Sequence, residues 1–253
     1  MPDADFDFVF FWKGHDIECP RALVRSIRAI YGDATRVVQL SDRDTPEVPD
    51  VSEFIARNVH ADMMLSRLEA CAKFSLSRPA VFLDADMLVI DRFELPVFRE
   101  KDVVLLKREQ NATAPINPNY PEHYPEFVGK SLGEVMPFVA SFIATANGRF
   151  FSDLLEVALA LPARFHRWYG DQMALKRLAE RKKYRIKEVP ESVYSHPIKL
   201  ALGRDEIVST RKSGVRLLHF KGPKVKGFQR STCDALATLV PDHEESTSRS
   251  PVP

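Results

Sequence analysis

Two aspartates separated by one alanine follow a short apolar run, Ala80-Val81-Phe82-Leu83, near the middle of the chain. Because the run is continuously apolar, it predicts a strand that is buried on both faces. The carboxylates of Asp84 and Asp86 are costly to bury at its end without a partner. A divalent cation at the carboxyl edge of an open α/β sheet would compensate them. Oxygen ligands suit Mn²⁺ or Mg²⁺, which also bind phosphate oxygens, so a metal site is predicted here; a polar turn is the alternative.

A second polar segment lies near the end of the chain and reads His219-Phe220-Lys221-Gly222-Pro223-Lys224-Val225-Lys226-Gly227. One imidazole added to two carboxylates makes a suitable Mn²⁺ site, which predicts His219 as a third ligand. Gly222 and Lys224 are predicted to bring backbone N–H groups and positive charge to a phosphate. The alternatives are that His219 is a satisfied core residue and that the lysines form a solvated face.

Strand-like and helix-like patterns alternate through the first hundred residues and then continue more irregularly. Alternation of this kind predicts an α/β fold, with a mostly parallel central sheet flanked by helices, in a single domain. The expected strands are Phe6–Trp12, Arg36–Leu40, Ala80–Leu83, Asp102–Leu106, Phe138–Ala144 and Val215–Phe220. The expected helices are Arg21–Ile30, Asp62–Phe74, Arg149–Leu161 and Gln172–Arg181.

Composition restricts the classes of partner. The 253 residues carry 36 Lys and Arg against 35 Asp and Glu, so no global field favours nucleic acid. Three scattered cysteines, the lack of a signal peptide and the lack of a membrane-length apolar run predict a cytoplasmic protein without a membrane span, although peripheral association is compatible.

The domain is expected to cover residues 1–240, with a disordered, Ser-rich tail at 241–253. The Pro-rich stretch 115–125 is interpreted as a substrate-facing loop.

Three further residues lie in or next to predicted helices. Arg67 lies on the flank of an apolar stripe and requires an anion, either a structural carboxylate or a ligand phosphate. Asp171 comes just before the apolar positions of a helix, so a helix N-cap and a ligand contact are both open. Gln172 has no comparable capping role, which makes it the more diagnostic of the pair.

Together these motifs resemble glycosyltransferase family 8, the GT-A enzymes of the glycogenin and bacterial galactosyltransferase type. The resemblance rests on the strand followed by Leu83-Asp84-Ala85-Asp86 and on the distal His219-Phe220-x-Gly222. It extends to Arg67, 17 residues before Asp84, and to the Asp171-Gln172 pair. The sequence departs from the family at Val225, where the family has a lysine, and at Ala140-Ser141-Phe142, where an Asn-Ala-Gly is frequent.

The resemblance implies a GT-A, Rossmann-like fold and an Asp-x-Asp metal motif. It implies Mn²⁺ or Mg²⁺ as cofactor, a nucleotide-diphosphate sugar such as a UDP-hexose as donor, and retention of configuration. Metal ligands would be Asp84, Asp86 and His219; donor contacts would come from Arg67, Asp84, Gly222 and Lys224; and Asp171 and Gln172 would act beside the donor sugar. The acceptor, whether saccharide, lipid-linked glycan or protein, stays open, as does the choice between a nucleophilic Asp171 and front-side attack.

Two other functions are compatible with the residues. Haloacid-dehalogenase-type phosphatases also carry a strand followed by Asp-x-Asp, but theirs continues Gly-Thr, whereas Met87-Leu88 follows here. A catalytically inactive nucleotide-sugar-binding protein would tolerate the altered lysine positions. Product analysis distinguishes the three, because only a transferase consumes the nucleotide sugar, a phosphatase releases phosphate from monoesters, and a binding protein does neither.

Overall fold

Strand β1 (Asp7–Trp12) explains why apolar runs form the middle of the sheet. Val9 and Phe11 point into one hydrophobic core, and Phe8 and Phe10 point into a second core on the opposite face. The strand lies between two parallel neighbours, so both of its faces are covered. A strand in this position is stable only if successive side chains are apolar, which is why alternation is absent from its sequence. The computed structural model describes residues 4–116, 125–166, 169–222 and 225–239.

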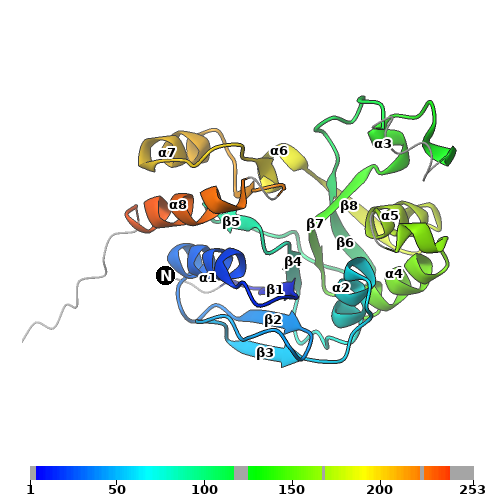
Figure 1. Cartoon of the computed structure of the whole chain (residues 1–253), viewed down its shortest axis with the longest axis horizontal. Coiled ribbons are helices and arrows are strands. Elements are labelled where there is room, and N and C mark those ends of the chain that lie inside the picture. The colour runs from blue at the N-terminus through cyan, green and yellow to red at the C-terminus, as the bar shows by residue number, and fades with distance from the viewer. Residues whose placement is uncertain (1–3, 117–124, 167–168, 223–224, 240–253) are drawn as a thin grey trace, which may run out of the picture.

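The central sheet has seven strands, and its elements follow the alternating order along the chain (Figure 1). Their spatial order is β3 (Glu53–Ala56), β2 (Val37–Ser41), β1, β4 (Ala80–Leu83), β7 (Phe138–Thr145), β6 (Asp102–Lys107) and β8 (Arg185–Pro190). Strand β7 runs antiparallel to β4 and β6, and the other strand pairs are parallel. The expected mostly parallel sheet is confirmed.

The antiparallel strand β7 matters for the site because its first half lies beside the ends of the parallel strands. Leu83, the last residue of β4, is paired with Phe142. The backbone N–H of Asp84 then donates to the carbonyl of Ser141 at 3.0 Å. Residues near the start of β7 therefore share the sheet edge at which β4 ends.

Helices cover both faces of the sheet, as expected for a single α/β domain. Those described are α1 (Glu18–Tyr31), α2 (Met63–Ala72), α3 (Leu132–Val135), α4 (Phe150–Leu159), α5 (Gly170–Glu180), α6 (Glu191–Tyr194), α7 (Arg204–Lys212) and α8 (Lys226–Ala237). Helices α2, α4 and α5 pack together on one face, and α1 packs on the other, where it also contacts α8 (Figure 1). Apolar side chains from these helices complete the two cores.

A small second sheet connects the two polar segments of the sequence. Strand β10 (Leu217–His219) lies between β5 (Met87–Val89), to which it is antiparallel, and β9 (His196–Pro197), to which it is parallel. A third hydrophobic core packs beneath it against α7 and α8. Residues more than a hundred positions apart in the sequence thus become neighbours across a strand pair.

Each expected strand and helix is present, with ends that differ by a few residues. The patterns did not predict β3, β5, β8, β9, α3, α6, α7 or α8. Helix α7 has a predominantly polar sequence and contributes only Ile207 as a buried residue, so its amphipathic signal is weak. Most of the Pro-rich stretch (117–124) and the expected tail (241–253) lie outside the described residues.

Candidate functional site

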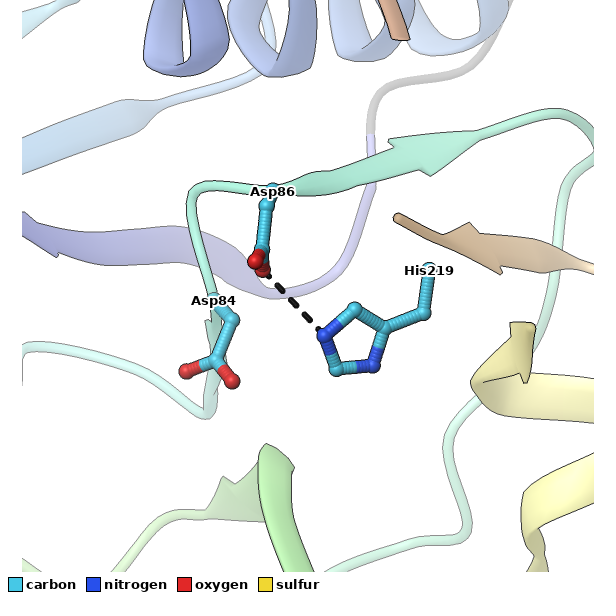
Figure 2. A group of neighbouring side chains, drawn as sticks. All are labelled: Asp84, Asp86 and His219. Carbon is cyan, nitrogen blue, oxygen red and sulfur yellow. Dashed lines mark ion pairs between the residues drawn. The ribbon is translucent and has the colours of Figure 1, made fainter. Parts of the chain in front are cut away.

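The pairing of β10 with β5 brings His219 to the two aspartates. Asp84 follows β4 directly, Asp86 precedes β5, and His219 ends β10, where it is paired with Met87. The N–H of Phe220 donates to the carbonyl of Asp86 at 2.9 Å, which fixes the two segments at this point. Figure 2 shows the side chains of Asp86 and His219 facing each other, with Asp84 beside them.

The geometry of the three side chains suits one divalent cation. Their ligand atoms all lie within 4.8 Å of one another, and His219 Nε2 is 3.2 Å from Asp86 Oδ1. Ligands of an octahedral ion at ~2.1 Å lie ~3.0 Å apart in adjacent positions and ~4.2 Å apart in opposite ones. The imidazole and the Asp86 carboxylate already have the adjacent spacing, and an Asp84 oxygen lies within 4.8 Å of both. A hard or borderline cation therefore fits these donors.

Arg67 has two carboxylates as its anionic neighbours. From α2 its Nη1 contacts Asp84 Oδ1 at 2.5 Å and lies 3.8 Å from Asp171 Oδ2, while Nη2 donates to the carbonyl of Ala140. Burial would lower the pKa of Arg67, but the charges of Asp84 and Asp171 outweigh burial and raise it. The guanidinium thus orients one predicted metal ligand and links it to the predicted sugar-facing pair. A donor contact by Arg67 stays a prediction.

Asp171 and Gln172 lie in the first turn of α5, so the expectation of an N-cap at Asp171 is wrong. The capping position is Tyr169, in the left-handed region with φ of 65°, and Gly170 begins the helix. Asp171 is buried, and burial raises the pKa of its carboxyl, an effect that Arg67 opposes and Asp84 reinforces. Its Oδ1 accepts the N–H of Gln172 at 2.7 Å.

Arg108 orients the side chain of Gln172. Arg108 follows β6 directly. It donates from Nη2 to Gln172 Oε1 and from Nε to the carbonyl of Met136 at 2.7 Å. Because the carbonyl oxygen of Gln172 is taken by Arg108, its amide NH₂ group is left as the donor end. No sequence pattern singled out Arg108, since an arginine after a strand has no diagnostic spacing.

Gly170 is required by the close approach of the preceding turn. A Cβ at this position would lie 2.1 Å from the carbonyl oxygen of Phe165. We expect Gly170→Ala to displace the start of α5, at a cost of about 1–3 kcal/mol of unfolding free energy. A shift of about 1 Å in Asp171 and Gln172 should lower turnover by up to a hundredfold.

Thermal unfolding and steady-state kinetics measure the two effects of Gly170→Ala. Gly148→Ala is the matched control, because a Cβ there would meet no atom within 4 Å. Wild-type stability and turnover in Gly170→Ala would contradict the steric argument.

Gln229 fixes the backbone of the Asp-Ala-Asp turn through hydrogen bonds from its side chain. No pattern in the sequence identified this residue. It is fully buried on α8, and its amide nitrogen lies 3.0 Å from the carbonyls of Ala85 and Met87 and 3.1 Å from that of Cys19. These bonds bracket Asp86 on both sides. A single glutamine in an unrecognised helix gives no sequence signal, so only the packing of α8 against α1 and β5 identifies it.

Lys221 forms an ion pair inside the protein. Its Nζ contacts the fully buried carboxylate of Glu191 at 2.7 Å, and the same carboxylate accepts the N–H groups of Glu109 and Gln110 at 3.0 Å. Burial would raise the pKa of Glu191, but Lys221 and these N–H groups outweigh it and lower the pKa. Glu191 therefore ties together the segments after β6 and β10.

Gly222 follows in the left-handed region, with φ of 95° and open space around its Cα. Its exposed backbone turns the chain after β10, as a phosphate-facing loop would require. Lys224, the other residue expected near a phosphate, lies outside the described residues.

We expect Glu191→Gln to destabilise the protein by about 1–3 kcal/mol at neutral pH, because it leaves Lys221 without its counter-charge. The pKa of Glu191 is lowered in the folded state, so its stabilisation is complete above the unfolded pKa of ~4.3. That stabilisation disappears as pH falls through the folded-state pKa. The difference between the two proteins should therefore shrink on acidification.

Urea unfolding at several pH values between 7 and 3 measures this trend. Glu188→Gln is the control, since it removes a more exposed partner of Lys107, and an ion pair screened by solvent contributes little to stability. A difference that stays constant with pH would contradict the ionic role of Glu191.

The membrane-spanning potential of the helices and the state of the cysteines bear on where the protein acts. Across the residues that the structure describes, no helix combines the length and the apolar character needed to cross a bilayer. Cys19, Cys71 and Cys233 are free thiols, and burial raises the pKa of Cys71 to about 12. A cytoplasmic location stays a prediction.

The fold resembles those of several solved glycosyltransferases. The chain is similar to the bifunctional glycosyltransferase WbbM (TM-score 0.56, 16% identity), to the galactosyltransferase LgtC in complex with donor and acceptor sugar analogs (0.55, 14%), and to the glycosyltransferase GlyE of Streptococcus pneumoniae (0.54, 12%). The alignments cover 95%, 95% and 94% of this chain, respectively. The chain spans 50% of WbbM, 63% of GlyE and 98% of LgtC.

Sequence comparison gives no corresponding match. No family model matches the chain, and no curated protein matches it. At identities of 12–16% the structural likeness establishes the fold. The chain thus has the GT-A-like fold of these glycosyltransferases, as its motifs predicted.

Proposed function

We propose that this protein is a metal-dependent glycosyltransferase that moves a sugar from a nucleotide diphosphate, with a UDP-hexose as donor, to an acceptor. The observation that supports this most is the set Asp84, Asp86 and His219, gathered at the carboxyl edge of a GT-A-like sheet. Ligands of open α/β sheets bind at this edge, and two carboxylates with an imidazole suit a cation that binds diphosphate oxygens. The phosphatase alternative is not favoured, because the structural similarity is to glycosyltransferases.

The three ligands would hold Mn²⁺ or Mg²⁺, and this cation would act as a Lewis acid for the departing nucleoside diphosphate. Lys221 is paired with Glu191. Lys224 is therefore the lysine that we expect to bring positive charge to the diphosphate. Backbone N–H groups around Gly222 would supplement it, since fixed donors stabilise developing negative charge without reorganisation.

Asp171 and Gln172 would act on the sugar. The Asp171 carboxylate is linked through Arg67 to Asp84, which keeps it close to the predicted metal ligands. A negative charge there would stabilise an oxocarbenium-like transition state or attack the anomeric carbon, and front-side attack is equally compatible. Either route retains the donor's configuration. The acceptor is a saccharide, a lipid-linked glycan or a protein side chain.

Thermal-shift screening of nucleotide sugars tests the proposal. Each donor is measured with Mn²⁺, with Mg²⁺ and with chelator, and a ligand at 100 times its dissociation constant should stabilise by ~2.7 kcal/mol. The positive donors then enter an acceptor screen in which released nucleoside diphosphate and glycosylated product are measured together. Release of phosphate from simple monoesters, with no stabilisation by any nucleotide sugar, would contradict the proposal.

A further inference from the structure

Two buried serine hydroxyls lie directly behind His219. Its Nδ1 is 2.8 Å from Ser195 Oγ, which is in turn 3.1 Å from Ser141 Oγ. Ser195 ends the short helix α6, and Ser141 lies in β7, so three separate elements meet in this chain of hydrogen bonds. All three residues are at most 5% exposed. The hydrogen bonds between them are therefore shielded from bulk water.

The ring of His219 needs a different hydrogen-bond arrangement without a cation and with one. Nε2 lies 3.2 Å from Asp86 Oδ1, and a neutral imidazole in this position donates Nε2–H to the carboxylate. Nδ1 must then accept a hydrogen bond from the Ser195 hydroxyl. When Nε2 coordinates a cation, its lone pair is needed for the metal, so the ring proton must sit on Nδ1 and be donated backwards.

A hydroxyl satisfies both arrangements because it donates and accepts, whereas a carbonyl or a carboxylate only accepts. In the first arrangement Ser141 donates to Ser195 and Ser195 donates to Nδ1. In the second, Nδ1–H donates to Ser195 and Ser195 donates to Ser141. The ring carries one proton in both arrangements: the proton on Nε2 is released to solvent as the cation binds, Nδ1 takes up one proton from solvent, and each serine keeps its own hydrogen.

Ser141 also fixes the opposite side of the predicted metal site. Its backbone carbonyl accepts the N–H of Asp84 at 3.0 Å, independently of its side chain. One residue of β7 thus holds the backbone of one ligand and, through Ser195, the imidazole of another.

We propose that Ser195 and Ser141 are positioning residues for the metal site, forming a reversible hydroxyl pair that accepts the hydrogen bond from His219 Nδ1–H when Nε2 binds a divalent cation. The inference rests on the metal ligands of the proposed function and does not require the transfer reaction. Outer-sphere partners of metal-bound histidines fix the tautomer and orientation of the ring, and their loss typically weakens metal binding about 10- to 100-fold.

Mn²⁺ binding measures the contribution of the hydroxyls directly. Free Mn²⁺ is titrated by electron paramagnetic resonance, with and without UDP and in the absence of any sugar donor. We expect Ser195→Ala to bind Mn²⁺ about 10- to 100-fold more weakly. Ser141→Ala should show a smaller loss of Mn²⁺ affinity, because Ser195 still accepts the hydrogen bond from Nδ1–H. Ser192→Ala, an exposed serine on the same short helix, is the matched control and should bind as wild type does.

Nitrogen-15 NMR of the histidine rings reports the tautomer and separates positioning from a general loss of structure. In the wild type, His219 should carry its proton on Nε2 without a cation and on Nδ1 after Mg²⁺ is added. In Ser195→Ala the shift to Nδ1 should require more Mg²⁺ or fail. Wild-type Mn²⁺ affinity in Ser195→Ala, an unchanged tautomer, or no Mn²⁺ binding by wild type would overturn the inference. Altered affinity without any glycosyl transfer would support it while the proposed function fails.

Discussion

Replacing Asp86 with alanine should abolish metal-dependent donor binding and leave the fold intact. The Asp86 carboxylate lies 3.2 Å from His219 Nε2, at the spacing of adjacent ligands, so its loss removes the best-placed oxygen of the set. Without a cation, Asp84 and Asp86 are neighbouring like charges, and removing one of them relieves repulsion. The variant also loses the hydrogen bond from His219 Nε2. Because the two effects oppose each other, it should unfold close to the wild-type temperature when chelator is present.

The measurement compares thermal shifts by nucleotide sugar with Mn²⁺ and with chelator. The wild type should gain ~2.7 kcal/mol at a ligand concentration of 100 times the dissociation constant, and Asp86→Ala should gain nothing from the metal. Glu94→Ala, which removes an exposed acid from the segment after β5, should keep the full effect. A folded Asp86→Ala protein that binds donor with unchanged metal dependence would exclude Asp86 as a ligand.

Replacing Asp171 with asparagine should lower turnover by about a hundred- to a thousandfold, while donor affinity changes little. Loss of one preorganised electrostatic contact to a transition state costs about this much. The asparagine keeps the shape of the side chain and an oxygen for the N–H of Gln172, but it removes the charge that faces Arg67. Only an interaction stronger in the transition state than in the ground state affects turnover in this selective way.

Steady-state kinetics and donor titrations give the two quantities separately for Asp171→Asn. Glu180→Gln at the other end of α5 is the control and should behave as wild type. Proton NMR of the product from an α-linked donor should show an α linkage. A β-linked product would contradict retention, and near-normal turnover in Asp171→Asn would leave this residue with a structural role only.

Part of the architecture follows from the sequence because local chemistry decides it. Continuous apolar runs such as Ala80–Leu83 have no stable location except between two covered faces, so the central strands and the α/β class were predictable. Asp84 and Asp86 were predictable as a site for a similar reason. Charges at the end of a buried strand need compensation, and this requirement is already visible in the residue types.

The sequence predicted His219 and Arg67 as site residues, but only the tertiary structure decided which elements bring them to the aspartates. The antiparallel pairing of β10 with β5 places His219 beside Asp86, and no local pattern specifies which strand β10 will choose. The same is true of Arg67, whose guanidinium reaches Asp84 and Asp171 from α2, and of Ser195, whose hydroxyl acts only through His219.

The contrast has a single physical reason. Apolar periodicity and the cost of buried charge act within a few residues, and they are therefore written in the sequence itself. Hydrogen-bond partners such as Gln229, held against Ala85 and Met87 across the second sheet, are selected by the summed packing of many elements. The sequence alone determined the class of fold and the aspartate motif of the metal site, and the packed tertiary structure determined which side chains orient it.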